Sequence, residues 1–303
     1  MNYSESSSTA WLPEVIFGAH GCQRDVGLVS DPGGHIVDTI PKDQLKDPIH
    51  LRNRALLPGL VNAHSHAFQR VIRGRTEYRT KNVKDSFWTW REMMYYAANR
   101  LSPEDIYDAS RMAFLEMALS GITAVGEFHY LHNQPDGTLY DDPNLLAHEV
   151  VHAAWDVGLR IALLRVAYAR SGYETNPNPQ QNRFIEADPE AYLSHLVQLR
   201  SAFADVKERA WVGIAPHSVR AVPLHYLKEV IKFGNEQDLP IHMHVVEQPA
   251  EVSACIEEYG RSPVALLETE GLLSERFTGV HLIHITPKAA QMLANTRAMV
   301  CAC

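Results

Sequence analysis

The chain has little of what marks a secreted, membrane-spanning or disulfide-stabilised protein. Its four cysteines lie too far apart or too close together for an obvious disulfide framework, and 301–303 is interpreted as a small-residue strand, not a metal site. No stretch approaches the ~18 apolar residues of a membrane-spanning helix. The first apolar segment, 11–17, is too short and too interrupted for a signal peptide. These absences predict a cytoplasmic protein.

Positive charge is also scarce. The chain contains 28 Lys and Arg residues against 36 Asp and Glu residues, which gives a net charge of −8, and it has no basic block. A nucleic-acid-binding surface normally shows as a basic cluster or stripe. We therefore expect neither nucleic acid nor a membrane among its partners. The 46% apolar and 21% charged composition is that of an ordinary globular protein.

From about residue 55 onward, short apolar segments alternate with segments of helical periodicity. The expected strands are 55–63, 123–128, 161–167, 211–215, 241–246, 280–285 and 299–303. The expected helices are 103–120, 147–157, 189–203, 224–237 and 263–267. The helix at 103 has a strong start signal, because Ser102 can cap it and a proline and two acids follow.

Strands that are apolar throughout and alternate with helices predict a parallel sheet covered by helices. The favoured closure is a (β/α)8 TIM-type barrel over 57–303, preceded by a small β region over 1–56 with a hairpin turn at 31–34. A doubly wound open sheet is the alternative, but no Gly-x-Gly-x-x-Gly supports it. A barrel needs eight strands and the chain stops in the seventh, so we expect its C-terminal end to be missing.

Histidines gather where these strands are expected to end, and barrel active sites form at those ends. His64 and His66 end the first strand, and residues two apart on a strand point the same way. Further polar residues follow later strands: Glu127, His129 and Tyr130, then His217, then His242 and His244, then His281 and His284. A single buried histidine is ordinary, but histidines at the ends of four strands indicate a metal site.

Imidazole suits zinc and related divalent ions. Three histidines and an acid leave a zinc-like ion one position for water, whose pKa falls to about 7. His64 and His66 would be two ligands, but spacing alone does not choose between His242 and His244 for the third. Glu247, just beyond the same strand, is placed to shuttle a proton to a leaving nitrogen.

The segment from Leu57 to His66 resembles the strand-one signature of the amidohydrolase superfamily, and His244-x-x-Glu247 resembles the strand-five signature of its deaminase branch. This resemblance implies that His64, His66 and His244 bind one divalent metal ion, that Glu247 shuttles the proton, and that His281 orients the attacking water. Zinc is the expected ion, with Fe²⁺ or Mn²⁺ as alternatives. Binuclear members also use a strand-four lysine, which 211–217 lacks.

Four further segments narrow the resemblance to the formimidoylglutamate deiminases: 64–70, 87–92, 128–130 and 215–220. The residues that would hold the substrate by this resemblance are Gln69, Arg91, Tyr130, His217 and Arg220. Arginine suits a glutamate derivative, because its guanidinium binds carboxylates in bidentate fashion. The two tryptophans, Trp88 and Trp90, are interpreted as loop packing.

The resemblance implies hydrolytic deimination of N-formimino-L-glutamate, a small dicarboxylate, to N-formyl-L-glutamate and ammonia in histidine degradation. Another aminohydrolase of the superfamily, acting on guanine, adenosine or a chlorotriazine, is the alternative within the class. A non-catalytic metal-binding fragment is the alternative outside it, because the family's strand-eight aspartate is absent. A homodimer is the assembly considered first, since dimers are the commonest.

Overall fold

The computed structural model describes residues 8–19, 21–76 and 87–303, and it divides into two compact units, one up to Leu60 and one from Val61 to Cys303. The first unit is a five-stranded sheet in which β2 (Gly21–Gln23), β1 (Thr9–Gly18), β3 (Val26–Ser30) and β4 (Ile36–Pro41) follow one another, with β5 (Ile49–Leu56) parallel to β1. The expected hairpin at 31–34 joins β3 to its antiparallel neighbour β4. This unit confirms the predicted N-terminal β region.

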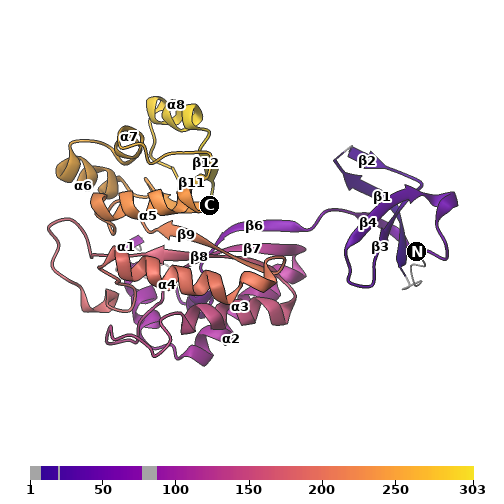
Figure 1. Cartoon of the computed structure of the whole chain (residues 1–303), viewed down its shortest axis with the longest axis horizontal. Coiled ribbons are helices and arrows are strands. Elements are labelled where there is room, and N and C mark those ends of the chain that lie inside the picture. The colour runs from indigo at the N-terminus through magenta and orange to yellow at the C-terminus, as the bar shows by residue number, and fades with distance from the viewer. Residues whose placement is uncertain (1–7, 20, 77–86) are drawn as a thin grey trace. The chain divides into compact units, whose positions relative to one another are not determined.

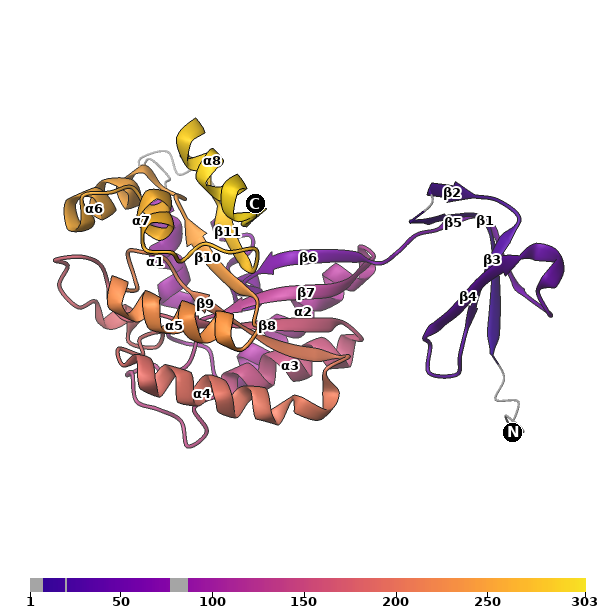
Figure 2. The same ribbon diagram turned by 45° about the horizontal axis from the view of Figure 1, so that its top comes forward.

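The second unit is built on a seven-stranded sheet whose strands follow one another in chain order (Figures 1 and 2). They are β6 (Leu60–Ser65), β7 (Ile122–His129), β8 (Arg160–Ala167), β9 (Ala210–Pro216), β10 (Ile241–Val245), β11 (Phe277–His281) and β12 (Met299–Cys301). From β7 to β12 each strand pairs parallel to the next. A doubly wound sheet would reverse its order at a switch point, so the sequential order confirms the predicted barrel-type fold.

Helices alternate with the strands, and several of them pack on β7, β8 or β9. The helices are α1 (Phe87–Ala98), α2 (Pro103–Leu119), α3 (Leu145–Val157), α4 (Pro189–Ala202), α5 (Leu224–Glu236), α6 (Pro249–Tyr259), α7 (Pro263–Thr269) and α8 (Pro287–Thr296). The predicted start of α2 is confirmed: the Ser102 hydroxyl accepts from the Asp105 N–H at 3.1 Å, and the Asp105 carboxylate accepts from the Ser102 N–H at 2.8 Å. The helices α1, α6 and α8 were not predicted.

The bounds of three predicted strands were wrong, and the strand predicted over 299–303 differs least, because β12 ends at Cys301. The expected strand 55–63 is divided, because β5 ends at Leu56, Pro58 and Gly59 follow outside any strand, and β6 begins at Leu60. The expected strand 280–285 instead begins at Phe277 and ends at His281. His281, the last residue of the strand, and Leu282 have φ values of 74° and 53°, and these two successive left-handed residues turn the chain out of the strand.

A close approach between β6 and β7 depends on Gly126. A Cβ atom at this position would lie 2.6 Å from the carbonyl oxygen of Ala63. Only glycine lets the two backbones come this near, as expected for a strand glycine at a tight contact. Because His64 follows Ala63, this contact helps to fix where β6 presents its first histidine. Within the described ranges, no helix is long and apolar enough to cross a membrane.

Candidate metal centre and active site

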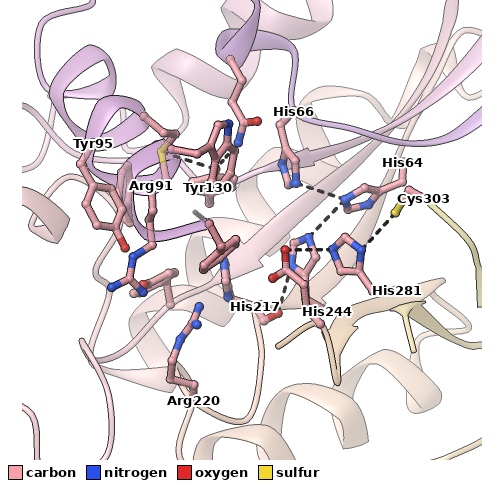
Figure 3. A pocket seen from close by; sticks show the side chains of 17 residues that line it. His64, His66, Arg91, Tyr95, Tyr130, His217, Arg220, His244, His281 and Cys303 are labelled. Carbon is pink, nitrogen blue, oxygen red and sulfur yellow. Dashed lines mark hydrogen bonds and ion pairs between the residues drawn. The ribbon is translucent and has the colours of Figure 1, made fainter. Parts of the chain in front are cut away.

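Three histidines converge at the carboxyl ends of the strands (Figure 3). The Nε2 atom of His64 lies 3.1 Å from Nε2 of His66 and 3.2 Å from Nε2 of His244. The ligand atoms of all three lie within 4.8 Å of one another, and they are the one such group of histidines, cysteines and acids in the part of the chain that the structure describes. The structure therefore brings together the three residues predicted to bind a metal ion.

The three imidazoles arrive from different local structures. His64 lies on β6 and His244 on β10, whereas His66 lies just beyond β6 and precedes the short 3-10 helix η2 (Ala67–Ile72). His66 has φ −128° and ψ 77°, so it is no longer part of the regular strand. The expectation that His64 and His66 share one strand face was wrong in detail. Both rings nevertheless reach the same point because the turn directs the second ring toward the first.

Backbone carbonyls orient two of the rings. Nδ1 of His66 lies 3.0 Å from the Phe128 carbonyl oxygen, and Nδ1 of His244 lies 3.2 Å from the His217 carbonyl oxygen. A carbonyl can only accept, so both Nδ1 atoms carry the ring proton and both Nε2 atoms present a lone pair. Burial lowers the pKa of His66 to about 4 and, with nearby histidines, that of His64 to about 2. The rings are therefore neutral near pH 7.

The donor set fits a divalent cation. At most one proton, on His64, can lie among the three facing Nε2 atoms, so hydrogen bonding between the rings cannot satisfy all of their lone pairs. Neutral imidazoles whose other nitrogen donates to a carbonyl are the usual arrangement of zinc-binding histidines. His242, the alternative left open by spacing, stays outside the cluster with its Nδ1 buried and without a hydrogen-bond partner among the described residues. His284 is exposed.

Glu247 and His281 lie beside this cluster at the ends of neighbouring strands. The Glu247 carboxylate is 3.6 Å from Nε2 of His281. The His281 ring stacks on that of His244, with centroids 5.3 Å apart and an interplanar angle of 21°. Its Nδ1 lies 3.5 Å from Sγ of Cys303. The four histidines 64, 66, 244 and 281 are called the histidine end of the site.

One cavity of about 470 Å³ contains the histidine end and every other predicted site residue. Among the residues that line it are all ten candidates: His64, His66, Gln69, Arg91, Tyr130, His217, Arg220, His244, Glu247 and His281. Gln69, on η2, donates to the Tyr130 hydroxyl at 2.8 Å. His217 is neutral, because burial and the charge of Arg220 hold its pKa well below the ordinary value.

The opposite side of the cavity carries Arg91, Arg220 and Tyr95 (Figure 3). Tyr168 also lines the cavity and shares a hydrogen-bond donor with Tyr95, and these four residues are called the cation end. Nε of Arg220 is buried and has no hydrogen-bond partner among the described residues. The Gln181 amide nitrogen donates to both tyrosine hydroxyls at 2.7 Å. Burial raises the pKa of Tyr168 well above its ordinary value, so its hydroxyl keeps its proton. A hydroxyl that accepts from Gln181 can donate that proton into the cavity.

Part of the cation end was not predicted from the sequence. Arg91 was placed in a segment without predicted structure, but it lies on α1, and Tyr95 follows one turn later on the same helix. Trp90, interpreted as loop packing, lies on a helix and not in a loop: it is on α1, packs against the core and also lines the cavity. The side chain of Trp88 lies outside the described residues. A helix prediction over 87–98 would have found Tyr95, whereas Gln181, on the three-residue 3-10 helix η3 (Pro179–Gln181), carries no periodic signal.

Buried acids support both ends. At the histidine end, the Glu127 carboxylate accepts from the N–H of Ala67, next to His66, at 2.7 Å, and burial raises its pKa to about 7. Near the cation end, the Glu186 N–H donates to the Tyr168 carbonyl oxygen at 2.8 Å. The Glu186 carboxylate pairs with the fully buried Arg165 at 2.5 Å.

Parallel strands with convergent histidines at their carboxyl ends define a barrel of the metal-dependent hydrolase class. Residues 55–303 match the Amidohydrolase family, and the chain belongs to this family. This confirms the resemblance predicted from the first and fifth strands.

Individual similar proteins support this family assignment. A formimidoylglutamate deiminase from Pseudomonas aeruginosa is 37% identical over 295 residues, which cover 97% of this chain and 62% of that protein. The crystal structure of an amidohydrolase from Brucella melitensis is 33% identical with a TM-score of 0.88, covering 97% of this chain and 64% of that one. An adenosine deaminase from Xanthomonas campestris with bound zinc has a TM-score of 0.75 at 20% identity, covering 97% and 62%, and shows the fold alone. The chain thus spans less than two thirds of each relative's length.

Proposed function

We propose that the protein catalyses the metal-dependent hydrolytic deimination of N-formimino-L-glutamate, giving N-formyl-L-glutamate and ammonia, as a step of histidine degradation. The observation that carries this proposal is the arrangement of one cavity, with a metal-binding group of histidines on one side and two arginines on the other. The 37% identical relative bears the name of this activity. The small-molecule dicarboxylate substrate and a homodimeric assembly belong to the same proposal.

The residues that would hold one divalent ion are His64, His66 and His244, with zinc proposed and Fe²⁺ or Mn²⁺ as alternatives. The bound ion would supply water activation at neutral pH. The protein's own contribution is to keep all three imidazoles neutral and turned inward, which the carbonyl oxygens of Phe128 and His217 achieve for two of them.

Glu247 and His281 would handle the proton. In the proposed step, the oxygen of a water molecule adds to the formimino carbon, and Glu247 takes the proton that this water loses. His281, 3.6 Å from the Glu247 carboxylate, orients the water. Glu247 delivers this proton to the imino nitrogen, which gives a tetrahedral intermediate with a hydroxyl and an amino group. Glu247 then carries the hydroxyl proton to the same nitrogen, the carbon–nitrogen bond breaks, the formyl carbon–oxygen double bond forms, and ammonia leaves. Both groups lie at strand ends beside the histidine cluster, so one carboxylate can serve both transfers.

The cation end would bind the carboxylates. The two guanidinium groups of Arg91 and Arg220 provide fixed positive charge with forked donors, and the hydroxyls of Tyr95 and Tyr168 add two donors. Gln69, Tyr130 and His217 would hold the part of the substrate between the two ends. The buried Nε of Arg220 has no hydrogen-bond partner among the described residues, and a substrate carboxylate would give it a charged acceptor, which favours the dicarboxylate over neutral guanine or adenosine.

The decisive experiment measures ammonia release by the full-length, metal-loaded protein from formiminoglutamate, guanine, adenosine and a chlorotriazine. Metal content is determined in the same preparation. We expect a divalent ion at about one per chain and a preference for formiminoglutamate. Turnover of a purine or triazine without turnover of formiminoglutamate would place the protein in another branch of the family.

A further inference from the structure

The chain leaves strand β10 through a turn with an unusual backbone. The strand ends at Val245, and Val246 follows with φ 56°. A β-branched side chain is sterically disfavoured in this left-handed region, so other contacts must hold the turn. The next residue is Glu247. The backbone of this turn therefore decides where the Glu247 carboxylate lies.

Both N–H groups of the turn donate to one carboxylate. The nitrogen of Val246 lies 3.2 Å from Oε1 of Glu251, and the nitrogen of Glu247 lies 3.2 Å from Oε2 of the same residue. Glu251 is only 5% exposed. A buried N–H without an acceptor is costly, and each oxygen of Glu251 satisfies one of them. Glutamine would offer a single acceptor and turn its NH₂ group toward the other donor.

These hydrogen bonds are not an ordinary helix cap. Glu251 is the third residue of α6, and in a capping box such an acid accepts from the N–H of the N-cap residue. The N-cap of α6 is Gln248, which makes no side-chain cap hydrogen bond. Glu251 instead accepts from the two residues before Gln248. The carboxylate thus joins the end of β10 to α6.

Charge links Glu251 to the rest of the site. Burial raises its pKa, while the positive charge of Arg220 and the two backbone donors lower it. The negative charge of the Glu247 carboxylate, on the turn itself, raises the pKa of Glu251. The charge of Arg220 therefore acts on Glu251 as well as on the cavity that Arg220 lines. The first turn of α6 also favours an acid, because the helix N-terminus is the positive end of its dipole.

We propose that Glu251 is a positioning residue for Glu247: it holds the 246–247 turn in its left-handed form and so keeps the Glu247 carboxylate beside His281. The inference rests on the proposed function only in treating Glu247 as the acid–base group. Glu251 touches neither substrate nor metal in this role, because it does not line the cavity.

The first test is Glu251→Gln, which keeps size and shape. We expect kcat for formiminoglutamate to fall about 10- to 100-fold, as for a misplaced catalytic group, with KM and bound metal near wild type. Glu257→Gln is the matched control, since Glu257 is exposed on the same helix. If Glu251→Gln does not fold, Glu251→Asp replaces it, because aspartate keeps the charge but is one methylene shorter.

A double-mutant cycle separates positioning from a general loss of structure. If Glu251 acts through Glu247, Glu251→Gln should lower kcat less than about 2-fold in a Glu247→Gln background. An equal fold loss in both backgrounds would overturn the proposal, as would a loss of bound metal in Glu251→Gln.

Amide hydrogen exchange tests the geometry without any substrate. We expect the peptide covering 246–247 to exchange about 10-fold faster or more in Glu251→Gln than in wild type, with no such change in Glu257→Gln. Unchanged exchange would overturn the inference. If the wild-type protein releases no ammonia from formiminoglutamate, the proposed function fails, whereas the exchange result still decides whether Glu251 holds the turn.

Discussion

The two ends of the cavity are built in opposite ways. The histidine end consists of imidazole rings at or just beyond strand ends, and main-chain carbonyls orient two of them. The cation end consists of charged and hydroxyl side chains, with Arg91 on α1 and Arg220 in the segment after β9. There a side chain, Gln181, orients the tyrosines. The barrel backbone thus sets one end, and helix and loop side chains set the other.

This difference predicts which property each end controls. Strand ends are rigid and are shared by proteins with the same barrel, whereas loops and added helices vary between them. The histidine end should therefore decide whether a metal ion binds, and the cation end should decide which substrate binds. Variants at the two ends should then change different measured quantities.

The largest effect is expected at the histidine end. His64→Ala removes the ring that faces both other ligands, so we expect loss of the bound metal and a fall in activity of about 10³-fold or more. Metal analysis of the purified variant checks this. His242→Ala is the control, because His242 lies two residues before His244 but outside the cluster, and it should keep its metal. Equal metal loss in both variants would contradict the assignment of ligands.

The next effect concerns the support of the cation end. Burial raises the pKa of Glu186, but its hydrogen bond with His195 and the charge of Arg165 lower it further, so the net pKa lies well below the ordinary value. Glu186→Gln leaves Arg165 buried and unpaired, and we expect a loss of about 3 kcal/mol in the free energy of unfolding at pH 7.

The stability loss in Glu186→Gln should depend on pH, because the pKa of Glu186 is lowered in the folded protein. A carboxylate with a lowered folded-state pKa stabilises the fold above its unfolded pKa of about 4.3, and this contribution is lost as the pH falls further. Urea unfolding should therefore show the gap between wild type and Glu186→Gln narrowing below about pH 4. Glu236→Gln is the control. It removes the exposed ion pair between Glu236 and Lys232 on α5, and it should lower the free energy of unfolding by less than about 1 kcal/mol both at pH 7 and below pH 4. A gap that is constant with pH would contradict this account.

A smaller effect is expected for substrate recognition. Arg220→Met should lower kcat/KM for formiminoglutamate about 10- to 100-fold, since a hydrogen bond to a charged group contributes about 1.5–3 kcal/mol. Metal content should not change. For a substrate analogue with a single carboxylate, Arg220→Met should lower kcat/KM by a smaller factor. Arg100→Met serves as the control, because Arg100 is exposed and lies over the Tyr96 ring. Loss of metal in Arg220→Met would show that the two ends are not separable.

The smallest effect is expected for the tyrosine hydroxyls. Tyr168→Phe or Tyr95→Phe should raise KM for formiminoglutamate about 2- to 10-fold, the range of one ordinary hydrogen bond. Steady-state kinetics on both variants checks this. If neither changes KM, the two hydroxyls do not contact the substrate, and the arginines alone form the cation end.

The sequence predicted the histidine end better than the cation end for a topological reason. Parallel strands in chain order bring their carboxyl ends together, so His64, His244 and Glu247 could be related although they are far apart in sequence. No such rule relates α1 to the loop after β8. Gln181 could not be predicted, because a three-residue 3-10 helix has no periodicity. Tyr168 directly follows β8, so the same strand-end rule could have found it.

The bounds of the strand predicted over 280–285 failed because the backbone there turns left-handed at residues that are not glycine. The apolar residues after His281, Leu282 and Ile283, continue the pattern of a strand, and the predicted strand therefore ran on to 285. Positive φ at His281 and Leu282 ends it instead. Nothing in the local composition signals this, because the conformation is imposed by neighbouring strands: the Leu282 N–H donates to the Val245 carbonyl oxygen at 2.9 Å.

Gly126 has a consequence for how mutational data on this protein would be interpreted. It has no side chain and lines no part of the cavity, yet any Cβ there would meet the Ala63 carbonyl oxygen at 2.6 Å and displace β6 next to His64. In a saturation mutagenesis screen selected for activity, we expect position 126 to tolerate substitution as poorly as His64, with even alanine rejected. A tolerance map would then mark Gly126 like a binding residue, although its contribution is the space it leaves empty.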